Sequence, residues 1–140
     1  MGNTPSIPKV NFEDIQHAVQ HPDKYLLINT LSPSSQNLLI VNTIHSDNEE
    51  MMMNQLLNTG KKDIDIIIYG RNSNDDMVYK KYQQLISLGF YNVYIYPGGL
   101  FEWLLLQDIY SNSEFKTTST DLDILKYKPP KVFGIQRLTY

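Results

Sequence analysis

Short apolar runs alternate with amphipathic segments through the middle of the chain. Residues 64–69 are β-branched and apolar at almost every position, as expected of a strand covered on both faces in a parallel sheet. From Asp75 onward the apolar positions recur with helical spacing, and Gly89 ends this segment. Residues 92–96 form a second apolar run, and a Pro-Gly-Gly turn leads from it into an apolar helix over residues 100–109. The pattern predicts two strands that alternate with two helices.

The N-terminal part of the chain shows a weaker pattern of the same kind. Asn11 is suited to cap a short helix, because its side chain can accept hydrogen bonds from the first-turn amides. Buried strands are expected at residues 26–29 and 38–41, and residues 47–57 predict a helix that carries three consecutive methionines. Strands that alternate with helices favour a single α/β domain with a mostly parallel central sheet and helices on both faces.

Several linked motifs in these segments resemble the second half of rhodanese-like domains. In that family a strand, an active loop, a helix, a second strand and a Gly-Gly turn followed by Trp occur in this order. Upstream, residues 25–30 and 38–44 resemble two earlier family segments less closely, with Asn29 where Asp is usual. The resemblance covers about residues 11–110 and implies the rhodanese-like fold. The motifs that carry it are Tyr69-Gly70, Leu88-Gly89-Phe90, Asn92-Val93, Gly98-Gly99 and Trp103.

The resemblance divides the chain into three parts. Residues 1–10 are expected to form a flexible leader, residues 11–110 the rhodanese-like domain and residues 111–140 an extended C-terminal arm. The arm is rich in Ser, Thr and Lys and contains Pro129-Pro130, which is typical of irregular structure. Its scattered apolar residues could dock it on another surface.

Gly2 fits the N-myristoylation pattern, because it follows Met1 and because Ser6 occupies the favoured hydroxyl position. Acylation of Gly2 and an unmodified leader stay open as alternatives. A single myristoyl chain holds a protein only weakly on a bilayer. The sequence has no apolar run long enough to span a membrane and no secretory signal. The chain is therefore expected inside the cell, in the cytoplasm or associated with a membrane.

Gly70 stands where the resemblance places the catalytic nucleophile. Sulfur transfer in this family requires a thiolate at the end of the strand, which takes up sulfur as a persulfide. Gly70 has no side chain, and the sequence contains no cysteine. A hydroxyl cannot carry the sulfur, and the phosphatase version of the fold also forms its intermediate on a cysteine thiolate. The sequence thus predicts neither sulfurtransferase nor cysteine-dependent phosphatase activity.

The loop after this strand offers polar groups but no activated nucleophile. Ser73 is more typical of a turn or a helix cap, because no histidine lies close to it in sequence, although His45 could approach it in space. Arg71 and the amides at a helix start would favour a bound anion, yet two aspartates expected in the first helical turn would repel it. Arg71 is accordingly expected to face solvent or a partner. The candidate site residues are Gly70, Arg71, Asn72, Ser73, Asn74, Asp75 and Asp76.

Composition and charge exclude several classes of partner and cofactor. The 140-residue chain has 12 Lys and Arg against 15 Asp and Glu, a net charge of −3, which gives no general attraction to nucleic acid. No cluster of His, Asp and Glu has metal-ligand spacing, so neither a metal nor another cofactor is expected. The basic residues gather only near the end of the chain, at Lys126, Lys128, Lys131 and Arg137.

Two functions from different classes stay open. The first is a catalytically inactive rhodanese-like domain that serves as a protein-interaction or structural module, with the loop and the arm as contact surfaces. The second is a cysteine-independent enzyme or anion-binding protein that uses the loop of residues 70–76. The missing thiolate favours the first, with another protein or a second copy of the chain as partner. Residues 69–75, 98–108 and 123–127 also resemble rhodanese-like proteins of large DNA viruses of protists, which implies a viral and virion setting.

Overall fold

The computed structural model of the chain describes residues 6–134, so Gly2 and Arg137 lie outside the described part. None of the helices within residues 6–134 is long and apolar enough to cross a bilayer. The helices are α1 (Phe12–Gln20), α2 (Ser46–Asn58), α3 (Met77–Ser87) and α4 (Gly99–Ile109). The strands are β1 (Tyr25–Asn29), β2 (Thr43–Ile44), β3 (Asp65–Tyr69) and β4 (Val93–Tyr96), and two 3-10 helices are η1 (Pro33–Ser35) and η2 (Ile124–Tyr127).

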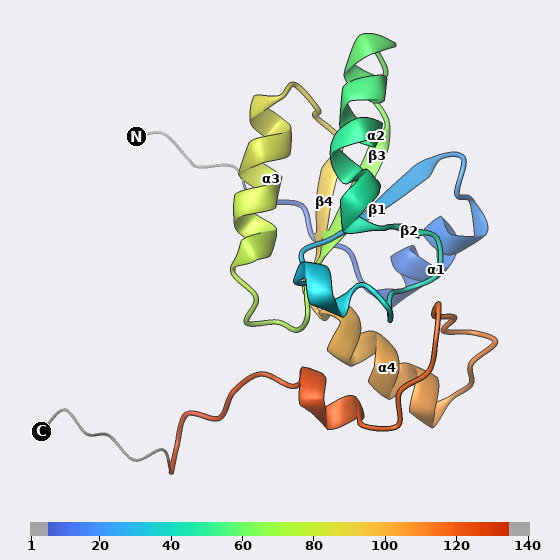
Figure 1. Ribbon diagram of the computed structural model, residues 1–140, viewed down its shortest axis with the longest axis vertical. Coiled ribbons are helices and arrows are strands. Elements are labelled where there is room, and N and C mark those ends of the chain that lie inside the picture. Colours follow the sequence, from blue (N-terminus) through green and yellow to red (C-terminus); the bar gives the residue numbers. More distant parts are fainter. Residues whose placement is uncertain (1–5, 135–140) are drawn as a thin grey trace, which may run out of the picture.

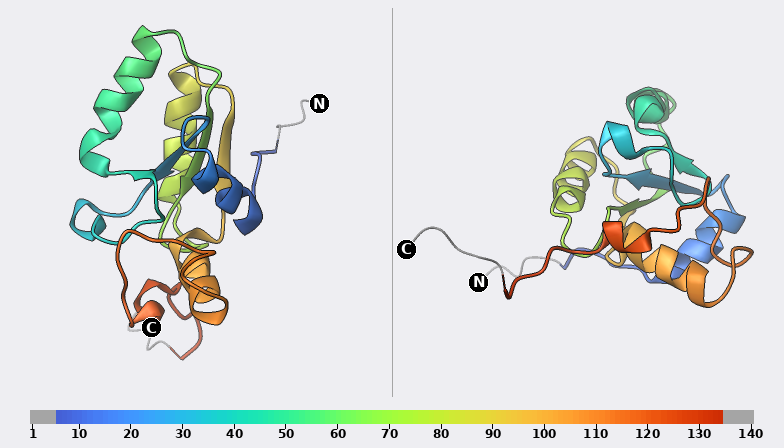
Figure 2. Two further views of the ribbon diagram at one scale, coloured as in Figure 1. Left: turned by 90° about the vertical axis from the view of Figure 1, so that its right-hand side faces the viewer. Right: turned by 60° about the horizontal axis from the view of Figure 1, so that its bottom comes forward.

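The four strands form one parallel sheet in the order β2-β1-β3-β4. β1 and β3 occupy its centre, and the register pairs Ile28 with Ile68 and Ile68 with Ile95. Helices α2 and α3 pack on one face, while α1 and α4 cover the other (Figures 1 and 2). The predicted single α/β domain, with a parallel sheet and helices on both faces, is confirmed.

Alternation along the central strands divides the buried side chains into two cores. Ile66 and Ile68 of β3 belong to the core beneath α2 and α3, where Leu85 also packs. Ile67 lies on the opposite face, in the core that contains Trp103 of α4. Because β3 is apolar on both faces, it is buried between two helical layers, as its sequence predicts.

Two element boundaries differ from the sequence predictions. The prediction of a strand at residues 38–41 is wrong. Only Ile40 pairs there, in an isolated antiparallel bridge with the arm, and strand β2 begins after this segment. Asn42 explains the shift, since its φ of 68° turns the chain before it enters the sheet. Helix α3 begins at Met77 rather than Asp75, because the Asp75 side chain bonds back to the preceding loop.

The folded domain begins before residue 11. Lys9 pairs with Ile95 of β4 in an isolated parallel bridge. The Val10 N–H donates to the Ile95 carbonyl at 2.9 Å, and the Ile95 N–H donates to the Pro8 carbonyl at 3.0 Å. Residues 8–10, expected in a flexible leader, therefore extend the edge of the sheet.

Asn29, which stands where the family usually has Asp, is buried at the end of β1 and forms a reciprocal amide pair with Gln36. Its Nδ2 donates to Gln36 Oε1 at 3.0 Å, and Gln36 Nε2 donates back to Asn29 Oδ1 at 2.8 Å. Asn29 Nδ2 also donates to the Ile44 carbonyl at 3.2 Å. An Asp at this position would have no N–H to donate to Gln36 Oε1 and the Ile44 carbonyl. The side-chain amide of Asn29 therefore fixes the connection from β1 to β2.

Within residues 110–134, which follow α4, the only helix is η2, and the first part of this segment packs against the domain. Trp103 Nε1 donates to the Lys116 carbonyl at 3.1 Å, and the Phe115 ring lies 5.0 Å from the Trp103 ring. The Thr118 N–H donates to the Leu39 carbonyl at 2.9 Å. The arm then passes beneath α4 as η2 and runs away from the domain only after η2 (Figure 1).

Candidate functional site

The loop of residues 70–76 follows β3 at the carboxyl end of the sheet, and the start of α4 holds it in place. The N–H groups of Leu100 and Phe101 donate to the carbonyls of Gly70 and the next residue, each at 2.9 Å. Gly99 permits this approach, because its φ is +67° and a Cβ there would lie 2.7 Å from the Gly70 oxygen. The Gly-Gly turn recognised in the sequence therefore positions the loop.

Asp75 turns back into the loop, and its carboxylate accepts the hydrogen bonds that converge there. Oδ2 accepts from the Arg71 N–H at 3.2 Å and from the Thr30 hydroxyl at 2.9 Å, while Oδ1 accepts from the Met77 N–H at 3.0 Å. Three donors that could hold an oxyanion thus hold a carboxylate of the chain itself. The placement of Asp75 and Asp76 in the first helical turn is wrong, since the first turn of α3 contains no acidic residue.

The Asp75 carboxylate also lies where a side chain on Gly70 would project. A Cβ built on Gly70 would be 2.3 Å from Asp75 Oδ2, 2.7 Å from Cγ and 2.8 Å from Cβ. Carbon atoms in contact prefer separations of about 3.5–4.0 Å. Because the Asp75 Cβ is itself too close, rotating the carboxylate alone does not relieve the clash. The loop is closed to any side chain at Gly70 while Asp75 keeps this position.

The C-terminal arm closes the loop from the outside. Asn72 Nδ2 donates to the Tyr127 carbonyl at 2.9 Å, and the Arg71 guanidinium donates to the Lys126 carbonyl at 2.5 Å. The same guanidinium lies 4.6 Å from the centroid of the Tyr127 ring, a cation–π contact. Tyr127 is only 5% exposed and belongs to the same core as α4. Arg71, expected to face solvent or a partner, instead binds the arm.

An open hollow of about 700 Å³ lies between the loop, the segment after β1 and the arm. Ser73 is exposed in a turn at this hollow. His45 lies at the N-cap of α2, where its Nδ1 accepts from the Asp47 N–H at 3.2 Å, and no histidine lines the hollow. Ser73 therefore has no base to activate it there. Among residues 6–134, no three His, Asp or Glu side chains gather as a metal site.

Two buried tyrosines near the loop join neighbouring segments rather than act as bases. The Tyr69 hydroxyl accepts from the Ile40 N–H at 3.1 Å and bonds the Thr43 hydroxyl at 2.7 Å, and burial raises the pKa of Tyr69. The Tyr96 hydroxyl donates to Glu102 Oε1 at 2.6 Å, and burial together with the Glu102 carboxylate raises the pKa of Tyr96. Both side chains therefore stay protonated at neutral pH.

A match to a known family model identifies the family of this chain. The family model for the rhodanese-like domain matches residues 10–106, more than half of the chain. The chain belongs to the rhodanese-like family. No match was found among curated proteins.

Solved structures of other rhodanese-like proteins share the fold at low sequence identity. A single-domain sulfurtransferase of Saccharomyces cerevisiae is 20% identical with a TM-score of 0.55, covering 74% of this chain and 94% of that one. The rhodanese-like domain of the Anabaena protein Alr3790 is 17% identical with a TM-score of 0.58, covering 96% and 94%. A yeast protein tyrosine phosphatase of the rhodanese family is 12% identical with a TM-score of 0.57, covering 87% and 99%. The shared fold therefore does not fix the reaction.

The sequence pattern of this rhodanese-like domain locates the loop but does not indicate which side chains fill and cover it. Thr30 follows β1, and neighbouring parallel strands end at the same edge of a sheet, so its place beside the loop could have been inferred from the strand order. The contact of the Asp75 side chain with the Arg71 amide is indicated only weakly by the sequence, through the tendency of Asp to bond nearby backbone amides in turns. The contact with Tyr127 has no local signal, because more than fifty residues separate it from Asn72.

Replacing Tyr127 with Ala should detach the arm from the loop. The change removes the ring beneath Arg71 and empties a buried site, so we expect the free energy of unfolding to fall by about 3 kcal/mol. Amide hydrogens of residues 121–128 should exchange faster. Denaturant unfolding and hydrogen exchange by mass spectrometry measure the two effects.

The matched control for this change is Tyr110→Ala, at a tyrosine that is 65% exposed. We expect it to lower stability by less than Tyr127→Ala and to leave the exchange of residues 121–128 unchanged. Wild-type protection of these residues in the Tyr127→Ala chain would contradict the contact between arm and loop.

Proposed function

We propose that this rhodanese-like domain transfers no sulfur and serves as a protein-interaction module. The observation that carries the proposal is the Asp75 carboxylate, which fills the space beside Gly70 and accepts from Arg71 and Thr30. A persulfide or cysteinyl-phosphate intermediate needs a thiolate at that place, and the chain has no cysteine. The same carboxylate disfavours the alternative of an anion-binding loop, because it occupies the donors and repels a second anion.

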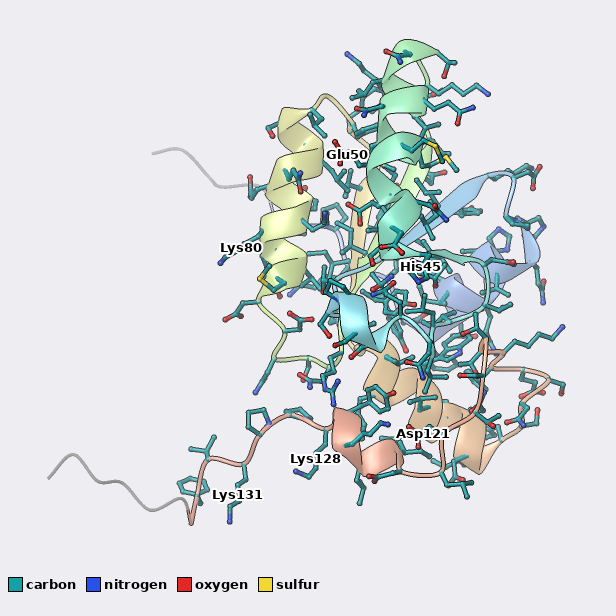
Figure 3. The ribbon with its side chains drawn as sticks, viewed as in Figure 1. His45, Glu50, Lys80, Asp121, Lys128 and Lys131 are labelled. Atoms are coloured by element: carbon teal, nitrogen blue, oxygen red, sulfur yellow. The ribbon has the colours of Figure 1, made fainter. Side chains whose placement is uncertain are left out.

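The arm supplies the contact surface in this proposal. Four large apolar side chains of the arm are exposed, and exposed apolar surface is what a protein partner buries. Two lysines beside them point away from the domain (Figure 3) and take part in none of the ion pairs of the described residues. An acidic protein surface with an apolar centre would complement this composition. The exposed apolar residues are Leu122, Leu125, Val132 and Phe133, and the lysines are Lys128 and Lys131.

A cysteine introduced at Gly70 tests the closed loop, because it would be the only thiol in the chain. We expect wild-type protein to show no thiosulfate-to-cyanide sulfur transfer above buffer. Gly70→Cys should also be inactive and should lose about 1–3 kcal/mol of stability, since the new side chain overpacks against Asp75. Adding Asp75→Gly removes both the carboxylate and the Cβ that lies 2.8 Å from the new side chain, so the thiol should react with an aromatic disulfide at least about tenfold faster than in Gly70→Cys.

Ser73→Cys is the matched control for thiol reactivity, because Ser73 is exposed in the same loop. Its rate should not change when Asp75→Gly is added. Sulfur transfer by the wild-type chain would refute the proposal. Equal reactivity of Gly70→Cys with and without Asp75→Gly would show that Asp75 does not close the loop.

Affinity capture with variants of the arm tests the interaction surface. A chain carrying Leu125→Ala and Phe133→Ala should lose partners at least about tenfold relative to wild type, because it removes exposed apolar contacts without emptying a core. Met51→Ala, at a side chain that is 66% exposed on α2, is the control and should retain them. Quantitative mass spectrometry of the captured proteins makes the comparison. Capture of the same proteins at the same level by all three chains would exclude the arm as the interface.

A further inference from the structure

A small hollow of about 210 Å³ opens at the amino end of the sheet, on the face covered by α1. Tyr25 and Asp65 are the first residues of β1 and β3, so this hollow lies at the opposite end of the strands from the loop. Val10 and Ile67 contribute apolar surface to its lining. The polar and aromatic lining residues are Asp14, His17, Tyr25, Asp65 and Tyr94.

The strand register brings the aromatic rings and the carboxylate of this hollow together. Tyr25 pairs with Asp65, and Ile67 pairs with Tyr94, so the three side chains project from neighbouring strands to the same face. Asp65 thus has a tyrosine on the strand at each side. The His17 ring of α1 lies 5.4 Å from the Tyr25 ring in an edge-on arrangement. Rings from two strands and one helix therefore line the hollow together with the Asp65 carboxylate.

The charge of the hollow is negative and lacks a counterpart. Two carboxylates line it, while no Lys or Arg does. Asp14 is partly committed to the fold, because its Oδ2 accepts from the Asn11 N–H at 3.0 Å. Asp65 is half-buried, and among residues 6–134 its carboxylate takes part in no ion pair. A negatively charged hollow lined by aromatic rings has a cation as its electrostatic complement.

We propose that this hollow binds the cationic end of a Lys or Arg side chain from a partner protein. Aromatic faces attract ammonium and guanidinium groups, and Asp65 supplies the opposite charge. The volume is below the range of about 300–1,000 Å³ that is usual for small-molecule sites, which suits a side-chain end rather than a cofactor. The site is independent of the loop and of the arm, and its existence does not depend on the absence of sulfur transfer.

Amide chemical shifts of the full chain, recorded during titration with acetyl-Gly-Arg-Gly-amide, test the site. We expect saturable shifts at residues 65–67 and at Tyr94, with a Kd in the range of about 1 mM that befits one anchored side chain. Butylammonium, which offers the charge without a peptide, should bind more weakly. Butanol, which has the same alkyl chain without charge, should give no saturable shift.

Variants separate the site from general attraction to an acidic protein. Asp65→Asn should weaken binding at least about tenfold, while Asp63→Asn, at an exposed neighbour, should leave it unchanged. Tyr94→Leu keeps the charge and removes a ring, so it should also weaken binding and serves as a second test if Asp65→Asn does not fold. Unsaturable shifts, equal shifts with butanol, or wild-type affinity in folded Asp65→Asn or Tyr94→Leu would overturn the proposal. Tighter binding of butylammonium than of the peptide would overturn the assignment to a protein side chain.

Discussion

The hydrogen bonds that Asp75 accepts from the Arg71 N–H and the Thr30 hydroxyl determine the state of the whole loop. They hold the carboxylate against Gly70, so that only glycine fits at the end of β3. They also draw Asp75 out of the helix that follows, which is why α3 starts at Met77. The family resemblance places the catalytic nucleophile of a rhodanese-like domain at the position of Gly70. Here an internal anion takes both the space and the donors, so the site differs in the arrangement of the loop as well as in the absence of a thiol at Gly70.

Two further contacts hold the loop in this closed form. The start of α4 donates to the carbonyls of Gly70 and Arg71, which requires the positive φ of Gly99. The arm covers the other side, where Asn72 and Arg71 bind its main chain around the buried Tyr127. Gly99 and Trp103 therefore serve a structural purpose in this chain, which has no cysteine. Beyond this anchor at Tyr127, the side chains of Val132 and Phe133 are exposed.

The parts of this structure that sequence could predict are those set by local patterns. The apolar run at residues 65–69, the helical spacing of α3 and the Gly-Gly turn before α4 each depend on neighbours in sequence, and their order implied the α/β sheet. Residues 38–41 do not form the predicted strand, although their apolar side chains suggested one. The Ile40 amide bonds the Tyr69 hydroxyl instead of a neighbouring strand, and Asn42 turns the chain. The candidate site was predicted as a list of residues but not as an arrangement. Side-chain direction at Asp75 and the long-range contact of Tyr127 depend on the assembled fold, which no spacing in the sequence encodes.

Sulfate binding to the loop amides, followed by NMR in wild-type and Asp75→Ala chains, tests most directly whether Asp75 acts as an internal anion. The Arg71 and Met77 amide signals report on the donors that Asp75 occupies. In wild-type protein, and in the control Asp76→Ala, sulfate should cause no saturable shift of these signals. In Asp75→Ala, both signals should shift and saturate as sulfate takes the vacated donors. Equal, saturable sulfate binding by the wild-type and Asp75→Ala chains would contradict the claim that Asp75 fills this site.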